Sequence, residues 1–202
     1  MPQAPIRYAV AVAVALIAAT AGIAAAHGGH GPANVGHVAL ELVGQVNNSA
    51  PGVTPATSAQ FGYVSRVGDV PTGNQLTFYT DTTTNSVVNN GPLRIVSRTG
   101  RVTIYRDTSA DFADPSSFRD GTPVLTAVIR QQVILNTLTN AFTAHNVNTI
   151  TSTSPFALGS AQIRLGRVGG RFHTVISGQA TSATPPSAYM AGYTFSSRAP
   201  CR

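Results

Sequence analysis

Two of the chain's five histidines lie in a short Gly-rich segment that could bind a metal ion. If the chain is cleaved after Ala26, His27 becomes its first residue, and its amino and ring nitrogens can together chelate copper. His30, or a histidine from elsewhere in the chain, would supply a further nitrogen. A copper-binding oxidative protein that uses His27 is therefore one hypothesis. The alternative is a solvated leader without a physiological metal.

A second candidate site lies midway along the extended run Pro123 to Thr137. One face of this run is apolar except for a single amide, and it consists of Leu125, Ala127, Ile129, Gln131, Val133 and Leu135. The opposite face carries Arg130. Whichever face is buried, a polar group then lies among aliphatic side chains, and without a partner it costs about 1 to 3 kcal/mol. The pattern predicts a hydrogen-bonding partner or a bound ligand there, unless the strand passes into solvent and both groups face water.

Three further side chains are candidates for the same site. Tyr79 and Tyr105 lie in other predicted strands, across the sheet, and His145 lies in the predicted strand that follows Pro123 to Thr137. A few converging polar groups in an apolar cavity are typical of small-molecule sites. We therefore expect Arg130, Gln131, Tyr79, Tyr105 and His145 to contact a small hydrophobic molecule. For His145, a purely structural, hydrogen-bonded role is the alternative.

Motifs for catalysis are sparse. The chain has no Gly-x-Ser-x-Gly element, and its single cysteine, Cys201, is the penultimate residue. Asp107, Asp111, Asp114 and Asp120 share one loop and could bind calcium, but loop aspartates commonly stabilise turns instead. The sequence names no reaction and, apart from copper, no cofactor.

The N-terminal segment indicates export. Arg7 precedes an apolar stretch, Tyr8 to Ala26, which ends in the small-residue site Ala24-Ala25-Ala26. We predict a signal peptide over residues 1–26, a flexible Gly/His-rich leader over 27–36 and one domain over 37–202. The mature chain would be secreted or extracytoplasmic and would have no membrane span. The alternative is an uncleaved anchor.

The charge distribution argues against nucleic acid as a partner. The formal net charge is +6, and all 13 basic residues are arginines. They are scattered, apart from a loose group at Arg94, Arg98, Arg101 and Arg106. Neither a dense basic run nor an aromatic stacking platform accompanies them.

After the apolar stretch, the sequence has the β-branched residues and turn punctuation of strands rather than helical periodicity. The expected strands are Val38–Val46, Phe61–Val67, Leu76–Thr84, Leu93–Thr99, Val102–Arg106, Pro123–Thr137, Ala141–Thr153, Ile163–Leu165, Phe172–Gly178 and Tyr189–Phe195. Thr99-Gly100 predicts a tight hairpin. The long connection Asp107 to Thr122 is expected to form a lid or a short helical turn that contributes specificity.

This pattern predicts an all-β fold of about eight to ten strands. Long strands must twist and curl, which favours a single closed antiparallel barrel, with a β-sandwich as the alternative. The strand number and hairpin length are similar to those of calycin-like (lipocalin-like) and cyclase-like barrels. That resemblance concerns architecture alone.

Three hypotheses for function follow. The first is an exported barrel that binds a small apolar or amphipathic ligand, with isomerase or cyclase activity as an extension that needs only shape and one or two polar groups. The second is a structural or cell-surface interaction module without catalysis. The third is the copper protein based on His27. A cavity lined by Gln131 or Arg130 would favour the first, and a flat exposed patch the second.

Overall fold

The computed structural model describes residues 33–35, 38–181 and 185–196. The predicted signal peptide, both candidate copper ligands His27 and His30, and Cys201 lie outside the described residues. The copper hypothesis therefore stays a prediction. No helix within the described ranges is long and apolar enough to cross a bilayer.

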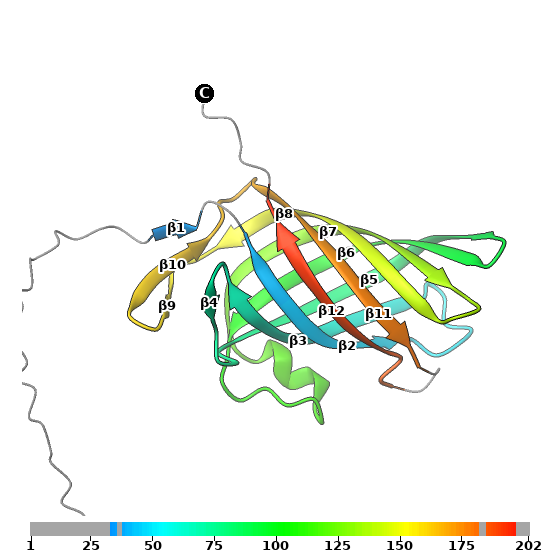
Figure 1. Cartoon of the computed structure of the whole chain (residues 1–202), viewed down its shortest axis with the longest axis horizontal. Coiled ribbons are helices and arrows are strands. Elements are labelled where there is room, and N and C mark those ends of the chain that lie inside the picture. Colours follow the sequence, from blue (N-terminus) through cyan, green and yellow to red (C-terminus); the bar gives the residue numbers. More distant parts are fainter. Residues whose placement is uncertain (1–32, 36–37, 182–184, 197–202) are drawn as a thin grey trace, which may run out of the picture. The chain divides into compact units, whose positions relative to one another are not determined.

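Eight antiparallel strands close into a barrel (Figure 1). In their order around the barrel they are β2 (Leu40–Asn48), β12 (Ala188–Phe195), β11 (Arg171–Ala180), β8 (Ala141–Thr153), β7 (Thr122–Asn136), β6 (Leu93–Arg106), β5 (Leu76–Asn90) and β3 (Thr57–Val67). Pairing of β2 with β3 closes the ring. The barrel prediction is confirmed, and the sandwich alternative is excluded. A short strand, β4 (Val70–Pro71), pairs with β3 outside the barrel.

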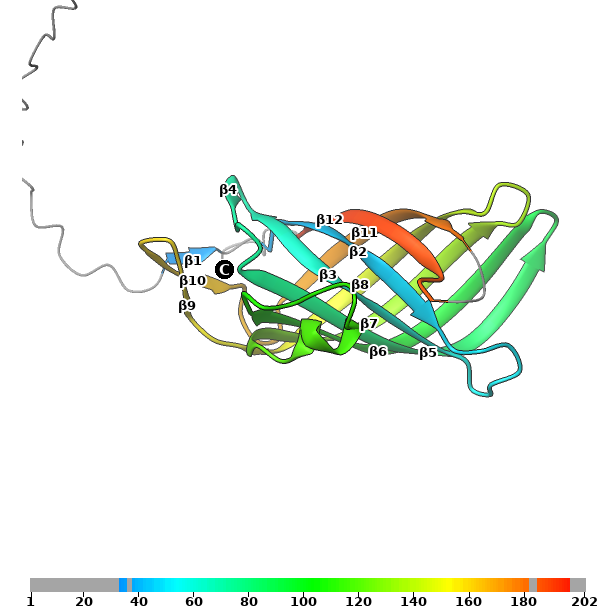
Figure 2. The same cartoon turned by 90° about the horizontal axis from the view of Figure 1, so that it is seen from below.

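A second, small sheet lies at one end of the barrel (Figures 1 and 2). It consists of β1 (Ala33–Val35), β10 (Ala161–Leu165) and β9 (Phe156–Leu158). β1 pairs with β10 in parallel, so part of the segment expected to be a flexible leader forms a strand. The β5–β6 and β7–β8 hairpins lie at the opposite end.

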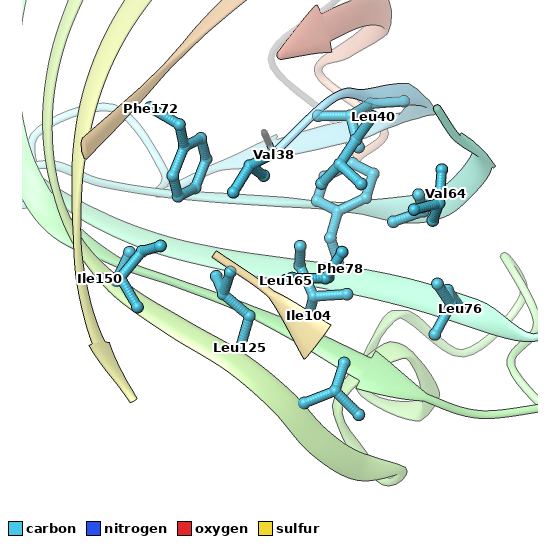
Figure 3. Close-up of a cluster of buried hydrophobic side chains, with 14 of the residues drawn as sticks. Val38, Leu40, Val64, Leu76, Phe78, Ile104, Leu125, Ile150, Leu165 and Phe172 are labelled. Atoms are coloured by element: carbon cyan, nitrogen blue, oxygen red, sulfur yellow. The ribbon is translucent and has the colours of Figure 1, made fainter. Parts of the chain in front are cut away.

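The end of the barrel next to the small sheet is filled by apolar side chains. Along β2, Leu40 and Leu42 are buried, whereas Glu41 and Val43 are exposed, which is the two-residue period of a strand with one buried face. Inward residues from several strands point toward one another in Figure 3, among them Phe78, Ile104, Leu125, Ile150 and Phe172. Leu165 from β10 joins this cluster, which couples the small sheet to the barrel core.

The predicted hairpin at Thr99-Gly100 is wrong. β6 runs without interruption from Leu93 to Arg106, and the turn that precedes it lies at Gly91, which has a φ of 57°. Gly100 instead pairs with Thr82 in mid-strand, where a Cβ atom would collide with the backbone of Asp81. Glycine in a strand often marks such a close backbone approach.

The long loop after β6 contains the expected helical turn, η1 (Pro115–Arg119), but covers the outer wall of the barrel. Phe118, fully buried, packs on Phe61 of β3 at a ring-centroid distance of 5.4 Å and on Tyr63 at 5.1 Å. Asp114 caps η1 by accepting a hydrogen bond from the Ser116 amide. The loop is therefore not a lid over the cavity described below, which it does not line.

Candidate functional site

A cavity of about 440 Å³ lies among the strand ends next to the β5–β6 and β7–β8 hairpins and is open to solvent. Its walls are mainly apolar, with Val46 from β2, Val96 from β6, Val133 and Leu135 from β7 and Phe142 from β8. The β2–β3 connection, residues 49–56, forms part of one side. The volume lies within the range of small-molecule sites, about 300 to 1,000 Å³.

A pair of buried amides lies where the open cavity ends. Gln60 lines the cavity, and its side-chain Nε2 donates a hydrogen bond of 3.2 Å to Oε1 of Gln131. These two side chains are 4% and 3% exposed, so both are in the interior. Below them only a space of about 20 Å³ is left, about enough for one water molecule. The open cavity is large enough for an organic ligand, and a second hollow of about 370 Å³ lies on the outer wall, where Val128, Arg130 and Val147 line it.

The inward polar residues follow the strand register around the barrel. Arg98 pairs with Gln131, Gln131 with Asn146, Asn146 with Thr174 and Thr174 with Thr194. Because side chains alternate between the two faces of a strand, directly paired residues share a face. This row, the polar belt, runs obliquely through the barrel from Arg98 at the cavity to Thr194, whose hydroxyl bonds to the backbone of Leu40 and Val38 beside the apolar core.

Arg98 is the charged member of this belt. Its guanidinium Nη2 donates to Oδ1 of Asn48 on β2 at 3.4 Å, and its Nε has no hydrogen-bond partner among the described residues. Desolvation, and then the nearby charge of Arg94, lower the pKa of Arg98 to about 10. Arg98 is still a cation at neutral pH.

Replacing Arg98 with methionine is expected to raise the free energy of unfolding of the ligand-free protein by about 1 kcal/mol. Methionine keeps an unbranched apolar stem and removes a desolvated charge that has no carboxylate partner. For a domain of this size that corresponds to about 2 to 4 °C in Tm. Thermal unfolding followed by circular dichroism measures the shift. Arg101→Met, which removes an exposed, outward charge from the same strand, is the control and should leave Tm unchanged. A lower Tm for Arg98→Met alone would contradict the account.

The five residues that the sequence suggested for the ligand site do not converge. Gln131 lies inside the barrel, on the apolar face predicted for β7. Arg130 and His145 are exposed, on the outward faces of β7 and β8. Tyr79 stacks on Phe61 at 6.1 Å under Arg119, whose guanidinium carbon lies 4.9 Å from the ring centroid, so Tyr79 belongs to the outer wall. Tyr105 pairs with Thr77, an outward residue bonded to the η1 backbone.

The burial of Tyr79 has an electrostatic consequence. Desolvation, and then the charge of Asp81, raise its pKa above the usual value. A phenol of this kind stays neutral at physiological pH. Tyr79 belongs to the outer aromatic cluster through its contact with Phe61. The hydrogen-bond partner of Gln131 is therefore Gln60 and not Tyr79.

Three of the four candidate calcium ligands, Asp107, Asp111 and Asp114, are engaged in turn formation. Asp107 accepts hydrogen bonds from the amide and hydroxyl of Ser109, and Asp114 accepts the corresponding pair from Ser116. The hydroxyl and amide of Ser116 lower the pKa of Asp114. Within the described ranges, no three His, Cys, Asp or Glu side chains converge in a way that could hold a metal ion.

Arg98, Asn48 and Gln60 were not among the site residues predicted from the sequence. Read as one continuous strand, residues 94–104 have an inward face of Arg94, Val96, Arg98, Gly100, Val102 and Ile104. That face repeats the signal seen on β7, with polar groups interrupting an apolar stripe, and would have identified Arg98.

Comparisons with known proteins give no further guide, since no family model, no curated protein and no solved structure matches this chain.

Proposed function

We propose that this protein is an exported barrel that binds a small amphipathic molecule in the cavity at its hairpin end. The observation that carries the proposal is the combination of an open cavity of about 440 Å³, apolar walls and the Arg98 guanidinium. Small-molecule sites have this composition, with a mostly apolar lining and a small number of placed polar groups.

The barrel design supports this role. Core side chains fill the end next to the small sheet, and the hydrogen-bonded pair Gln60 and Gln131 lies where the cavity ends. The cavity therefore has a rigid floor on strands and an open mouth between hairpins. Sites built on regular elements hold their geometry more closely than sites built on loops alone.

Closing the cavity with a bulky side chain tests the proposal. Val133→Trp places an indole on the cavity wall, and the neutral hydrophobic dye Nile red serves as the probe. We expect the unaltered protein to bind the dye, with a rise in its fluorescence, and the variant to bind it at least about tenfold more weakly because the indole occupies the space of the ligand.

The matched control is Val128→Trp, because Val128 is an outward residue of the same strand and is 47% exposed. This variant should bind Nile red as the unaltered protein does. If Val133→Trp also binds the dye unchanged, or if the unaltered protein does not bind it at all, the cavity is not the binding site and the proposal fails.

One observation favours an interaction module as the second candidate. The outer face of β12 exposes Tyr189, Tyr193 and Phe195, and β2 adds Val43 beside them, each about half exposed. Exposed aromatic side chains that lie together often mark a protein contact. An interaction through this outer face would not depend on the cavity, so Val133→Trp would leave it intact. Val133→Trp therefore separates the two candidate functions.

A further inference from the structure

The charge of the cavity wall is unbalanced. Arg98 and Arg94 both line the cavity, and no acidic side chain of the described chain does. The sequence has only seven acidic residues, and all of them lie on the outer faces of strands or in the loops 68–75 and 107–121. The only carboxylate paired with an arginine in the described ranges is Glu41, with Arg66 on the outer surface. Arg98 and Arg94 therefore have no counter-ion among the described residues.

Hydrogen-bond donors at the inner end of the cavity are also unpartnered. Nε of Arg98 and Nε2 of Gln131 make no hydrogen bond among the described residues, and the two side chains are paired across β6 and β7. The Oε1 acceptor of Gln131 is already used by Gln60. An unpartnered acceptor, Oδ1 of Asn146, lies on the residue that pairs with Gln131. The group that still lacks a counterpart is the Arg98 guanidinium, and a negatively charged acceptor suits it best.

The Arg98 guanidinium has one amide partner, Asn48, and no carboxylate, and its buried Nε is unpartnered. Such burial is costly, and an anion at this position would relieve the cost. Guanidinium groups match carboxylates and related oxyanions particularly well, because their planar N–H groups can donate in pairs. Four residues nearer the mouth, Arg94 is exposed and can be hydrated. The desolvated position of Arg98 therefore favours the anion at the inner end over the mouth.

We infer that the ligand is a single-chain amphiphile with an anionic head, such as a carboxylate, bound with its head inward at Arg98. The apolar chain extends along Val96, Val133, Leu135 and Phe142 toward the mouth. This inference rests on the proposed function and adds the chemical class of the ligand.

Decanoate and decanol, which share one alkyl chain and differ in head-group charge, test the inference by isothermal titration calorimetry at neutral pH. We expect decanoate to bind about ten- to a hundredfold more tightly than decanol, as charge-assisted hydrogen bonds in a desolvated site predict. Arg98→Met should remove most of this difference, because it weakens decanoate binding far more than decanol binding. Arg101→Met is the control and should behave as the unaltered protein does.

The outcomes separate the inference from the proposed function. If both probes bind the unaltered protein equally well, the cavity binds ligands but the anionic class is wrong. If neither binds, the proposed function itself fails. If Arg98→Met still preferred decanoate, the role of Arg98 would be overturned. That result would also show that the variant is folded, because only a folded barrel can bind the probes.

Discussion

Gly62→Val is expected to destabilise the barrel by at least about 4 kcal/mol, a large share of the 5 to 15 kcal/mol that typically stabilises a domain. Gly62 pairs with Gly44 where β2 and β3 close the ring. A Cβ atom on Gly62 would overlap the backbone of Val43 and Gly44. Because the clash is with backbone, no side-chain rotation can relieve it, and the two strands must separate.

The same closure positions an aromatic ring. Phe78 lies inside the barrel opposite Gly62 in the β3–β5 register, and its ring would lie 3.1 Å from a Cβ atom on Gly44. The two glycines thus leave the space that Phe78 fills.

Urea unfolding followed by far-UV circular dichroism measures the loss of stability in Gly62→Val. Ala59→Val, on the outward face of the same strand, is the control, and a Gly62→Val effect no larger than that of the control would show that the closure is not tight.

Phe118→Ala is expected to cost about 3 to 5 kcal/mol, the usual range for removing a fully buried phenylalanine. Its ring lies 4.8 Å from that of Phe112 and 5.4 Å from that of Phe61, measured between centroids, so truncation empties the centre of the outer aromatic cluster. Thermal unfolding measures the loss.

Ligand binding gives this variant a second readout. Since the loop 107–121 does not line the cavity, Phe118→Ala should bind decanoate with unchanged affinity at temperatures where it is folded. Phe112→Ala is the matched control for the loop, because Phe112 is less buried and should cost less stability. If folded Phe118→Ala bound decanoate more weakly than the unaltered protein, the loop 107–121 would contribute to ligand specificity, contrary to this prediction.

The sequence predicted the parts of the fold that depend on long, regular patterns. The alternation from Leu125 to Leu135 identified β7, the two faces that carry Gln131 and Arg130, and the hairpin to β8, but it left open which face is inward. Strand length also argued for curvature, and the barrel closes. These features could be derived because each depends on neighbouring residues of one strand.

Features that depend on contacts between distant segments could not be derived. Gly100 resembles a turn residue in sequence, and only the close approach of β5 shows why glycine lies in mid-strand. Because β6 was predicted as two strands divided at Gly100, the alternation that places Arg98 on the inward face was not recognised. Phe61 is outward yet fully buried, because a loop about 50 residues later in the chain covers it. The predicted involvement of Tyr79 in the ligand site overlooked this outer cluster.

The cavity could not be predicted from the sequence, because its walls come together only in the closed barrel. Asn48 and Arg98 are hydrogen-bonded across the barrel although they come from β2 and β6, which are not adjacent. Likewise, Gln60 and Gln131 meet across the interior from β3 and β7. No pairwise pattern within a strand or hairpin predicts such contacts, since they depend on the number of strands and on their tilt.

Native mass spectrometry of the protein isolated from its own host tests the central claim most directly, because it detects a bound molecule without assuming its identity. The account predicts a one-to-one organic adduct on the folded protein that is absent from the denatured chain, absent from Val133→Trp, and ionises as an anion after release. An adduct-free protein that also fails to take up added decanoate, or an adduct that Val133→Trp retains, would contradict it.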